Sequence, residues 1–220
     1  MAIEIGSSAK VPIEIGSSYD GAYLVTFDEN KIHTTFTASG DTVGAWVDEI
    51  YRVHRRRLSR LVIGLDVEWR ASRSSAAAAA SPPPALLQLC VGRRCLVLQI
   101  LRADYLPDAL FDFLADARFT FVGAGIQAGA ARLWAEYGFS VARAVDLGRL
   151  AAVKLGNPAL RGAGLQARVW EVMGLQVDKP DQVRMSAWDA RRLTKGQLKY
   201  ACADAFASFE VGRRLYDGEY

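Results

Sequence analysis

The chain has 220 residues, 51% of them hydrophobic and 23% charged, which is the balance of a globular domain with one sizeable core. Its net charge of +3 is compatible with nucleic-acid binding but too small to indicate it. With no apolar span of about 18 residues and no signal-peptide pattern, we expect neither membrane insertion nor secretion. Cys90, Cys95 and Cys202 lack metal-ligand spacing, so we expect a reduced location in the cytoplasm or nucleus.

The N-terminal part predicts a tail followed by a hairpin and a helix. IEIGSS occurs twice within residues 1–20, which we expect to form a tail without assigned function, before a single domain over residues 21–220. Residues 23–38 alternate around a polar turn, the pattern of a β-hairpin. A helix follows, with Asp41 or Thr42 as its expected cap.

A basic run follows this helix. It consists of Arg52, His54, Arg55, Arg56, Arg57 and Arg60. Positive charge suits the C-terminal end of a helix, so the run is interpreted either as a solvated helix end or as a patch that contacts phosphates. In the second interpretation Arg55, Arg56 and Arg57 bind nucleic acid.

Two acids interrupt the apolar run RLVIGLDVEWR at residues 60–70. Because side chains two apart on a strand share a face, Asp66 and Glu68 converge on one side. Converging carboxylates in a buried strand need a cation or strong hydrogen bonds. Taken alone, the pair indicates either a divalent metal site or a structural pairing with arginines.

The middle of the chain predicts an α/β fold on a mixed sheet. Residues 71–84, rich in Ser, Ala and Pro, are expected to be a flexible surface loop. Residues 86–91 and 95–100 flank a Gly-Arg-Arg turn and predict a second hairpin, with the acidic strand at or near the sheet centre. Helical patterns then alternate with short strands such as 119–122; they cover residues 106–116, 129–137, 143–155 and 165–173.

The last predicted helix begins with a capping box, Thr194 with Gln197. Tyr200 and Asp204 lie four residues apart on it, so they project from the same face. Asp204 stands among small apolar residues, which suggests that its carboxylate faces inward. Alone, the spacing is equally typical of a core tyrosine with an acid at its rim.

Taken together, the acidic strand and the late helix resemble the DEDD superfamily of 3′-5′ exonucleases, of the tyrosine type and closest to the Werner-syndrome-type branch. The resemblance runs from about Leu61 to Leu215 and includes three further motifs: FVGAGI at 121–126, RGAGLQ at 161–166 and SAW at 186–188. It implies a ribonuclease-H-like (DnaQ-like) mixed sheet flanked by helices.

The resemblance also implies a two-metal phosphodiesterase that acts on single-stranded or frayed 3′ ends of RNA or DNA. Asp66 would bridge two Mg²⁺ or Mn²⁺ ions, Glu68 and Asp204 would each bind one ion, and Tyr200 would orient the attacking water. These hard cations prefer carboxylate oxygens, and an ion pair about 4 Å apart can serve both the attacking and the leaving oxygen. The sequence does not decide between RNA and DNA.

The second motif departs from the family pattern. Where the family has an aspartate that helps to hold the second ion, this chain has Gly129. Glu136 is about two helical turns away and Asp146 is expected to cap a helix, so neither replaces it. The third candidate to replace the missing aspartate is an acid from another subunit of a homo-oligomer.

Two functions therefore remain open. The chain is either an exonuclease, weakened by Gly129, or an inactive pseudo-exonuclease. A pseudo-exonuclease would bind nucleic acid or assemble with an active relative that it regulates.

Overall fold

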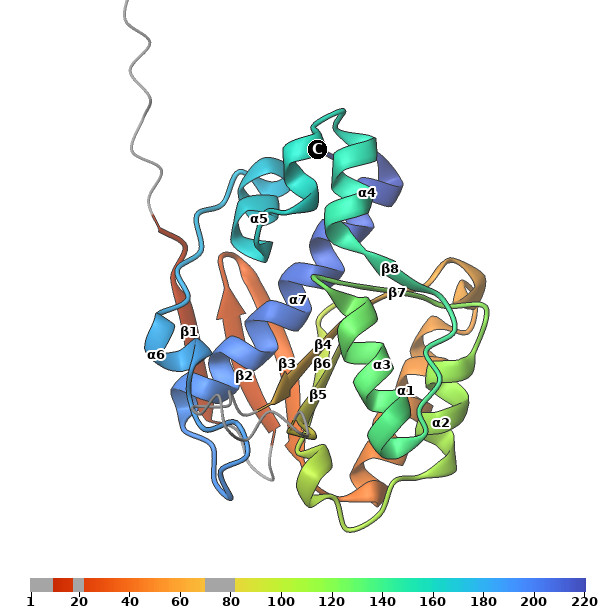
Figure 1. Cartoon of the computed structure of the whole chain (residues 1–220). Helices are drawn as coiled ribbons and strands as arrows, with labels where there is room; N and C mark the ends of the chain where they lie inside the picture. The colour runs from red at the N-terminus through yellow and green to blue at the C-terminus, as the bar shows by residue number, and fades with distance from the viewer. Residues whose placement is uncertain (1–9, 18–21, 70–81) are drawn as a thin grey trace, which may run out of the picture.

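One mixed sheet of eight strands organises the computed structural model, which describes residues 10–17, 22–69 and 82–220 (Figure 1). Of the predicted loop at 71–84, only the last three residues belong to this described part. In spatial order the strands are β1 (Ile13–Ser17), β2 (Ala22–Phe27), β3 (Asn30–Thr37), β6 (Arg94–Leu98), β5 (Pro84–Val91), β4 (Val62–Trp69), β7 (Thr120–Gly123) and β8 (Ala144–Asp146). The acidic strand β4 lies inside the sheet, antiparallel to β5 and parallel to β7.

Helices cover both faces of the sheet, which confirms the predicted α/β architecture. One face packs on α1 (Gly40–His54), α2 (Asp108–Ala115) and α3 (Ile126–Tyr137). The other packs on α4 (Leu147–Lys154), α5 (Leu165–Met173) and the long α7 (Lys195–Asp217), which crosses the sheet in Figure 1; the short α6 (Asp181–Arg184) precedes α7. No described helix is both long and apolar enough to cross a membrane.

Strand β4 divides its side chains between the two faces as the alternation predicts. Leu65 and Val67 are buried in the core beneath α1, α2 and α3. Asp66 and Glu68 point to the opposite face, where they meet Asp204 of α7. The two acids thus lie on the face opposite Leu65 and Val67, at the contact between the sheet and its longest helix.

Helix α7 approaches the sheet very closely because glycines line the contact. A methyl group on Gly64 of β4 would overlap the carbonyl oxygen of Ala205 and lie 2.7 Å from the backbone nitrogen of Phe209. Likewise, a methyl group on Gly212 of α7 would lie 2.7 Å from a methyl carbon of Val122. These glycines set the depth at which α7 packs, and therefore the position of Asp204 over β4.

The N-terminal segment differs from the expected tail. Residues 1–20 were predicted to stand outside the domain, whereas β1 pairs with β2 at the edge of the sheet. Val11, Ile13 and Ile15 pack against the core on the α7 side, since alternation in this segment places its apolar side chains on one face.

Two boundaries also differ from the prediction. The cap of α1 is Ser39, whose side chain accepts a hydrogen bond from the Thr42 backbone, so the prediction of Asp41 or Thr42 is wrong. The single helix expected over 143–155 divides into β8 and α4 at Asp146, which ends the strand and caps the helix. Both predicted hairpins are confirmed as β2–β3 and β5–β6.

We predict that Gly64→Ala destabilises the fold by about 2 kcal/mol or more, because the added carbon overlaps the α7 backbone and the helix must move. Gly44→Ala in α1 is the matched control, since nothing lies within 4 Å of the added carbon, and it should stabilise by about 1 kcal/mol. Urea unfolding of both variants measures the difference. Equal stability of the two variants would contradict the close packing of α7.

Candidate active site

Three carboxylates converge where α7 crosses β4. One oxygen each of Asp66, Glu68 and Asp204 lies within 4.8 Å of the others, and all three residues are half-buried. Their side chains come from two elements that are far apart in the sequence, so the close packing of α7 brings them together. An all-oxygen, all-anionic set of this size fits Mg²⁺ or Mn²⁺, which are hard cations.

The carboxylates are held in an unfavourable electrostatic environment. The pKa of Asp66 lies well above its usual value, chiefly because burial disfavours its charge and then because Glu68 and Asp204 repel it. Burial likewise raises the pKa of Glu68 and of Asp204. Such a cluster stays ionised only beside a strong positive charge.

Lys179 supplies a positive charge that the sequence interpretation did not identify. It lies between α5 and α6, and its Nζ donates to Glu68 Oε1 at 3.1 Å and to an oxygen of Asp204. Burial opposes its charge, yet the attraction of Asp204 and Glu68 outweighs burial and raises the Lys179 pKa. The Trp188 ring lies 5.7 Å away. A single lysine in a loop carries no spacing signal, which explains why the sequence did not reveal it.

Tyr200 lies one helical turn before Asp204 in α7 and is half-buried. Its pKa is raised, first by burial and then by the charges of Asp178 and Asp204. The neutral phenol is therefore its stable form, and its hydroxyl can donate a hydrogen bond. The predicted capping box at the start of α7, Thr194 with Gln197, is present and fixes where the helix begins.

Gly129 is the fourth residue of α3, beside the acidic strand but without a side chain. A carbon added to it would lie 3.1 Å from a methyl carbon of Val67, the residue between the two acids of β4. Asp146 accepts hydrogen bonds from the backbone nitrogens of Gly125 at 2.8 Å and Arg149 at 3.0 Å, which confirms its capping role. Within the ranges that the structure describes, the carboxylate cluster includes neither Asp146 nor Glu136.

Gln88 is a second residue that the sequence interpretation missed. It stands opposite Asp66 on β5 and is fully buried. Neither its amide nitrogen nor its amide oxygen has a hydrogen-bond partner among the described residues. Buried polar atoms without partners are rare, and this amide lies beside Asp66 on the face of the sheet that carries the acids.

The three other motifs that resemble the family pattern lie in the segments around the site. In FVGAGI, Gly125 adopts the left-handed conformation that starts α3, with φ of 64°. In SAW, the Ser186 hydroxyl accepts from the Gln197 amide at 3.0 Å, and Trp188 is buried under Lys179. RGAGLQ leads into α5. These motifs lie at the start of α3, at the start of α5 and just before α7.

The basic run lies away from the carboxylates. Arg55, Arg56 and Arg57 follow the end of α1 and are exposed to solvent. They stand near the beginning of β4, whereas Asp66 and Glu68 occupy its second half. A contribution of these arginines to nucleic-acid binding stays a prediction.

Replacing Asp66 should stabilise the metal-free protein. The folded state holds the Asp66 proton more tightly than the unfolded chain does, so parent stability falls as pH rises through the folded pKa. In EDTA at about pH 8, Asp66→Asn should raise the free energy of unfolding by about 1 kcal/mol or more, and the gain should shrink toward about pH 4. Urea unfolding at both pH values measures it, and a destabilised variant at pH 8 would contradict the raised pKa.

Lys179 should compete with a metal ion. Unit charges 4 Å apart interact by about 4 kcal/mol at an effective dielectric constant of 20, so Lys179→Met should tighten Mn²⁺ binding by roughly tenfold or more. Calorimetry with Mn²⁺ measures this. Lys199→Met, which removes a charge from the neighbouring face of α7, should change affinity little. Weaker Mn²⁺ binding by Lys179→Met would show instead that the lysine helps to organise the ligands.

Comparison with known proteins agrees with this geometry. Residues 43–217 match the family model of the 3′-5′ exonuclease. A 3′-5′ exonuclease of Arabidopsis thaliana is 31% identical over 156 residues, which cover 70% of this chain and 52% of that protein. The mouse bifunctional 3′-5′ exonuclease/ATP-dependent helicase WRN is 27% identical over 155 residues, 70% of this chain and 11% of that protein. The chain thus spans about half of the first relative's length and a small part of the second's.

Among solved structures, Escherichia coli RNase D, described as an exoribonuclease involved in structured RNA processing, aligns with a TM-score of 0.66 at 20% identity. The alignment covers 83% of this chain and 44% of RNase D, and at this identity it establishes the fold alone. The family match and the shared fold confirm the resemblance predicted from the sequence. The chain belongs to the 3′-5′ exonuclease family and has the ribonuclease-H-like fold.

Proposed function

We propose that this chain is a metal-dependent 3′-5′ exonuclease that removes nucleotides from 3′ ends of RNA or DNA. The convergence of Asp66, Glu68 and Asp204 within 4.8 Å carries the proposal. A structural ion pair would need one acid, whereas three acids around one space match a site for divalent cations. The family match over most of the chain supports the same reaction class.

In this proposal each residue has a defined task. Asp66, Glu68 and Asp204 hold Mg²⁺ or Mn²⁺, and Tyr200 orients the attacking water through its neutral hydroxyl. When bound, the cation supplies charge neutralisation at the scissile phosphate and lowers the pKa of water. Lys179 keeps the carboxylates ionised when no metal is bound, because its ammonium donates hydrogen bonds to Glu68 and Asp204.

The substrate is a single-stranded or frayed end. Metal-centred cleavage acts on the sugar–phosphate backbone, so the proposal covers RNA and DNA alike. Localisation in the cytoplasm or nucleus and assembly as a homo-oligomer or with an active relative also stay predictions. A partner subunit that supplied an acid near Gly129 would complete the second ion's ligands.

A second function is favoured by two observations: Gly129 has no carboxylate, and Lys179 pairs with two of the three acids. In this alternative the chain is a pseudo-exonuclease that binds 3′ ends without cutting them. The two functions are separated by an assay with labelled RNA and DNA in Mg²⁺ or Mn²⁺, with Asp66→Ala as control. Cleavage that disappears in Asp66→Ala supports the enzyme, and binding without cleavage supports the alternative.

Gly129→Asp tests whether the missing carboxylate limits cleavage. The added carboxylate should raise the cleavage rate by about 10³-fold. Each factor of ten in rate corresponds to about 1.4 kcal/mol of activation free energy, and holding the second metal ion stabilises the transition state by several kcal/mol. Gly129→Asn is the matched control, because it has the same shape without the charge. Combining each variant with Val67→Ala relieves the 3.1 Å contact that the new side chain would make.

Single-turnover rates and Mn²⁺ stoichiometry are measured for all four variants. A folded Gly129→Asp that binds more Mn²⁺ but cuts no faster than Gly129→Asn would place the defect elsewhere. Efficient cleavage by the parent, unchanged by the aspartate, would show that another group already completes the site.

A further inference from the structure

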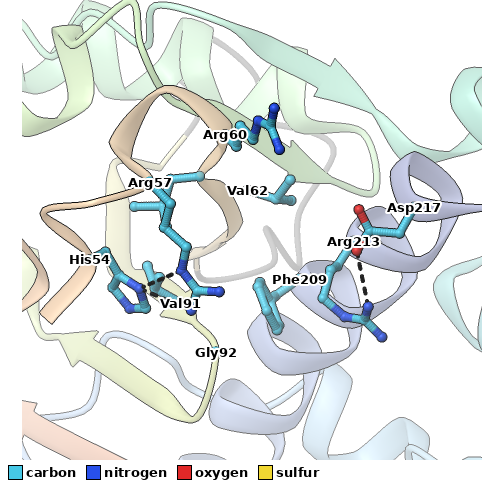
Figure 2. A pocket seen from close by; sticks show the side chains of 10 residues that line it. His54, Arg57, Arg60, Val62, Val91, Gly92, Phe209, Arg213 and Asp217 are labelled. Atoms are coloured by element: carbon cyan, nitrogen blue, oxygen red, sulfur yellow. Dashed lines mark hydrogen bonds and ion pairs between the residues drawn. The ribbon is translucent and has the colours of Figure 1, made fainter.

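A basic pocket lies at the opposite end of the α7–β4 contact from the carboxylates. It has a volume of about 300 Å³, and Figure 2 shows side chains from α1, β4 and α7 around it. The residues that matter for its chemistry are His54, Arg57, Arg60, Val62, Phe209 and Arg213. This volume is at the lower end of the range for small-molecule sites.

The pocket is separate from the carboxylate centre. Val62, at its wall, precedes Asp66 by four strand residues, which corresponds to about 13 Å. Gly64 lies between them, where the α7 backbone packs directly on β4 and leaves no room even for a methyl group. A ligand in the pocket therefore does not reach the three acids through the contact.

The charge in the pocket is positive and partly unpaired. Neither Arg57 nor Arg60 has an acidic partner among the described residues. Arg213 is already neutralised, since it pairs with Glu210 at 2.8 Å, Asp217 at 3.1 Å and Glu219 at 2.9 Å. Asp217, the one acid among the described residues that line the pocket, is thus engaged with Arg213 and leaves Arg57 and Arg60 for an external anion.

His54 holds Arg57 in place without cancelling its charge. Its Nδ1 accepts from Arg57 Nε at 3.3 Å and faces Nη2 at 3.2 Å, as the dashed lines in Figure 2 show. His54 is 5% exposed, so this acceptor is fixed by packing. Because Nδ1 accepts, the ring hydrogen is on Nε2, a buried atom that has no acceptor in the described chain. Donors therefore exceed acceptors around this site.

The wall of the pocket is apolar. Val62, Val91 and Phe209 line it, and Figure 2 places the Phe209 ring between Arg57 and Arg213. An inorganic anion would use only the arginines, whereas a phosphate attached to a nucleoside would also cover this apolar surface. A guanidinium group can donate two parallel hydrogen bonds to the oxygens of one phosphate, and an aromatic ring offers a stacking surface for a base.

We propose that this pocket is a second phosphate-binding site, which takes the phosphate of a nucleotide with Arg57 and Arg60 and packs its nucleoside against Phe209. The nucleotide is either a free nucleoside monophosphate or a residue of a bound strand. Binding here requires no metal and no cleavage, so it does not depend on the proposed nuclease activity.

Calorimetry of the full chain in EDTA and low salt tests the site, with inorganic phosphate, adenosine monophosphate and a short single-stranded oligonucleotide as separate probes. The double variant Arg57→Gln/Arg60→Gln should weaken nucleotide binding by at least about tenfold. Arg191→Gln/Arg192→Gln is the matched control, because it removes the same charge from two exposed positions that precede α7 and lie outside the pocket, and it should change binding less than about twofold.

The probes identify the source of the phosphate. If adenosine monophosphate binds more tightly than inorganic phosphate, and if its affinity depends on Arg57 and Arg60, the site is assigned to a free nucleotide. If only the affinity for the oligonucleotide depends on Arg57 and Arg60, the site is assigned to a residue of a bound strand. Equal losses in both double variants would reveal unspecific charge attraction and overturn the proposal. Absence of binding by every probe, or a loss caused by Lys179→Met at the carboxylate centre, would overturn it as well.

Discussion

The burial of three neighbouring carboxylates is the constraint around which the site is arranged. Asp66, Glu68 and Asp204 lie close together in a half-buried space, where burial raises the pKa of each. The arrangement persists because Lys179 places an ammonium between two of them. The fold therefore keeps a cation-binding space formed before any metal arrives, at a cost in stability that only a positive charge offsets.

The same contact between α7 and β4 explains how one helix contributes to both the carboxylate cluster and the basic pocket. Near its middle, α7 brings Asp204 to the acids of β4; farther toward its C-terminal end, it brings Phe209 and Arg213 to the basic pocket. Gly64 allows the close approach that separates these two regions. A helix held farther from the sheet would disrupt both the carboxylate cluster and the basic pocket. Both features therefore depend on how closely α7 packs on β4.

The sequence by itself determined the parts of the fold that local patterns encode. The alternation around Asp66 and Glu68 placed both on one face, and the capping box at Thr194 placed the start of α7; both hairpins were predicted for the same reason. Period and capping act within a few residues, which is why sequence alone reveals them. The resemblance added the pairing of the early strand with the late helix, and the direct packing of α7 on Gly64 of β4 bears it out.

Only the tertiary structure decided what meets across long sequence distances. Lys179 lies 111 residues from Glu68 in the chain, and no periodic pattern links them. The unpartnered amide of Gln88 beside Asp66 and the pocket that joins Arg57 to Phe209 likewise depend on how layers pack. Within the expected N-terminal tail, Ile13–Ser17 form strand β1 for the same reason, since an isolated apolar alternation does not reveal whether a sheet edge is available to pair with it.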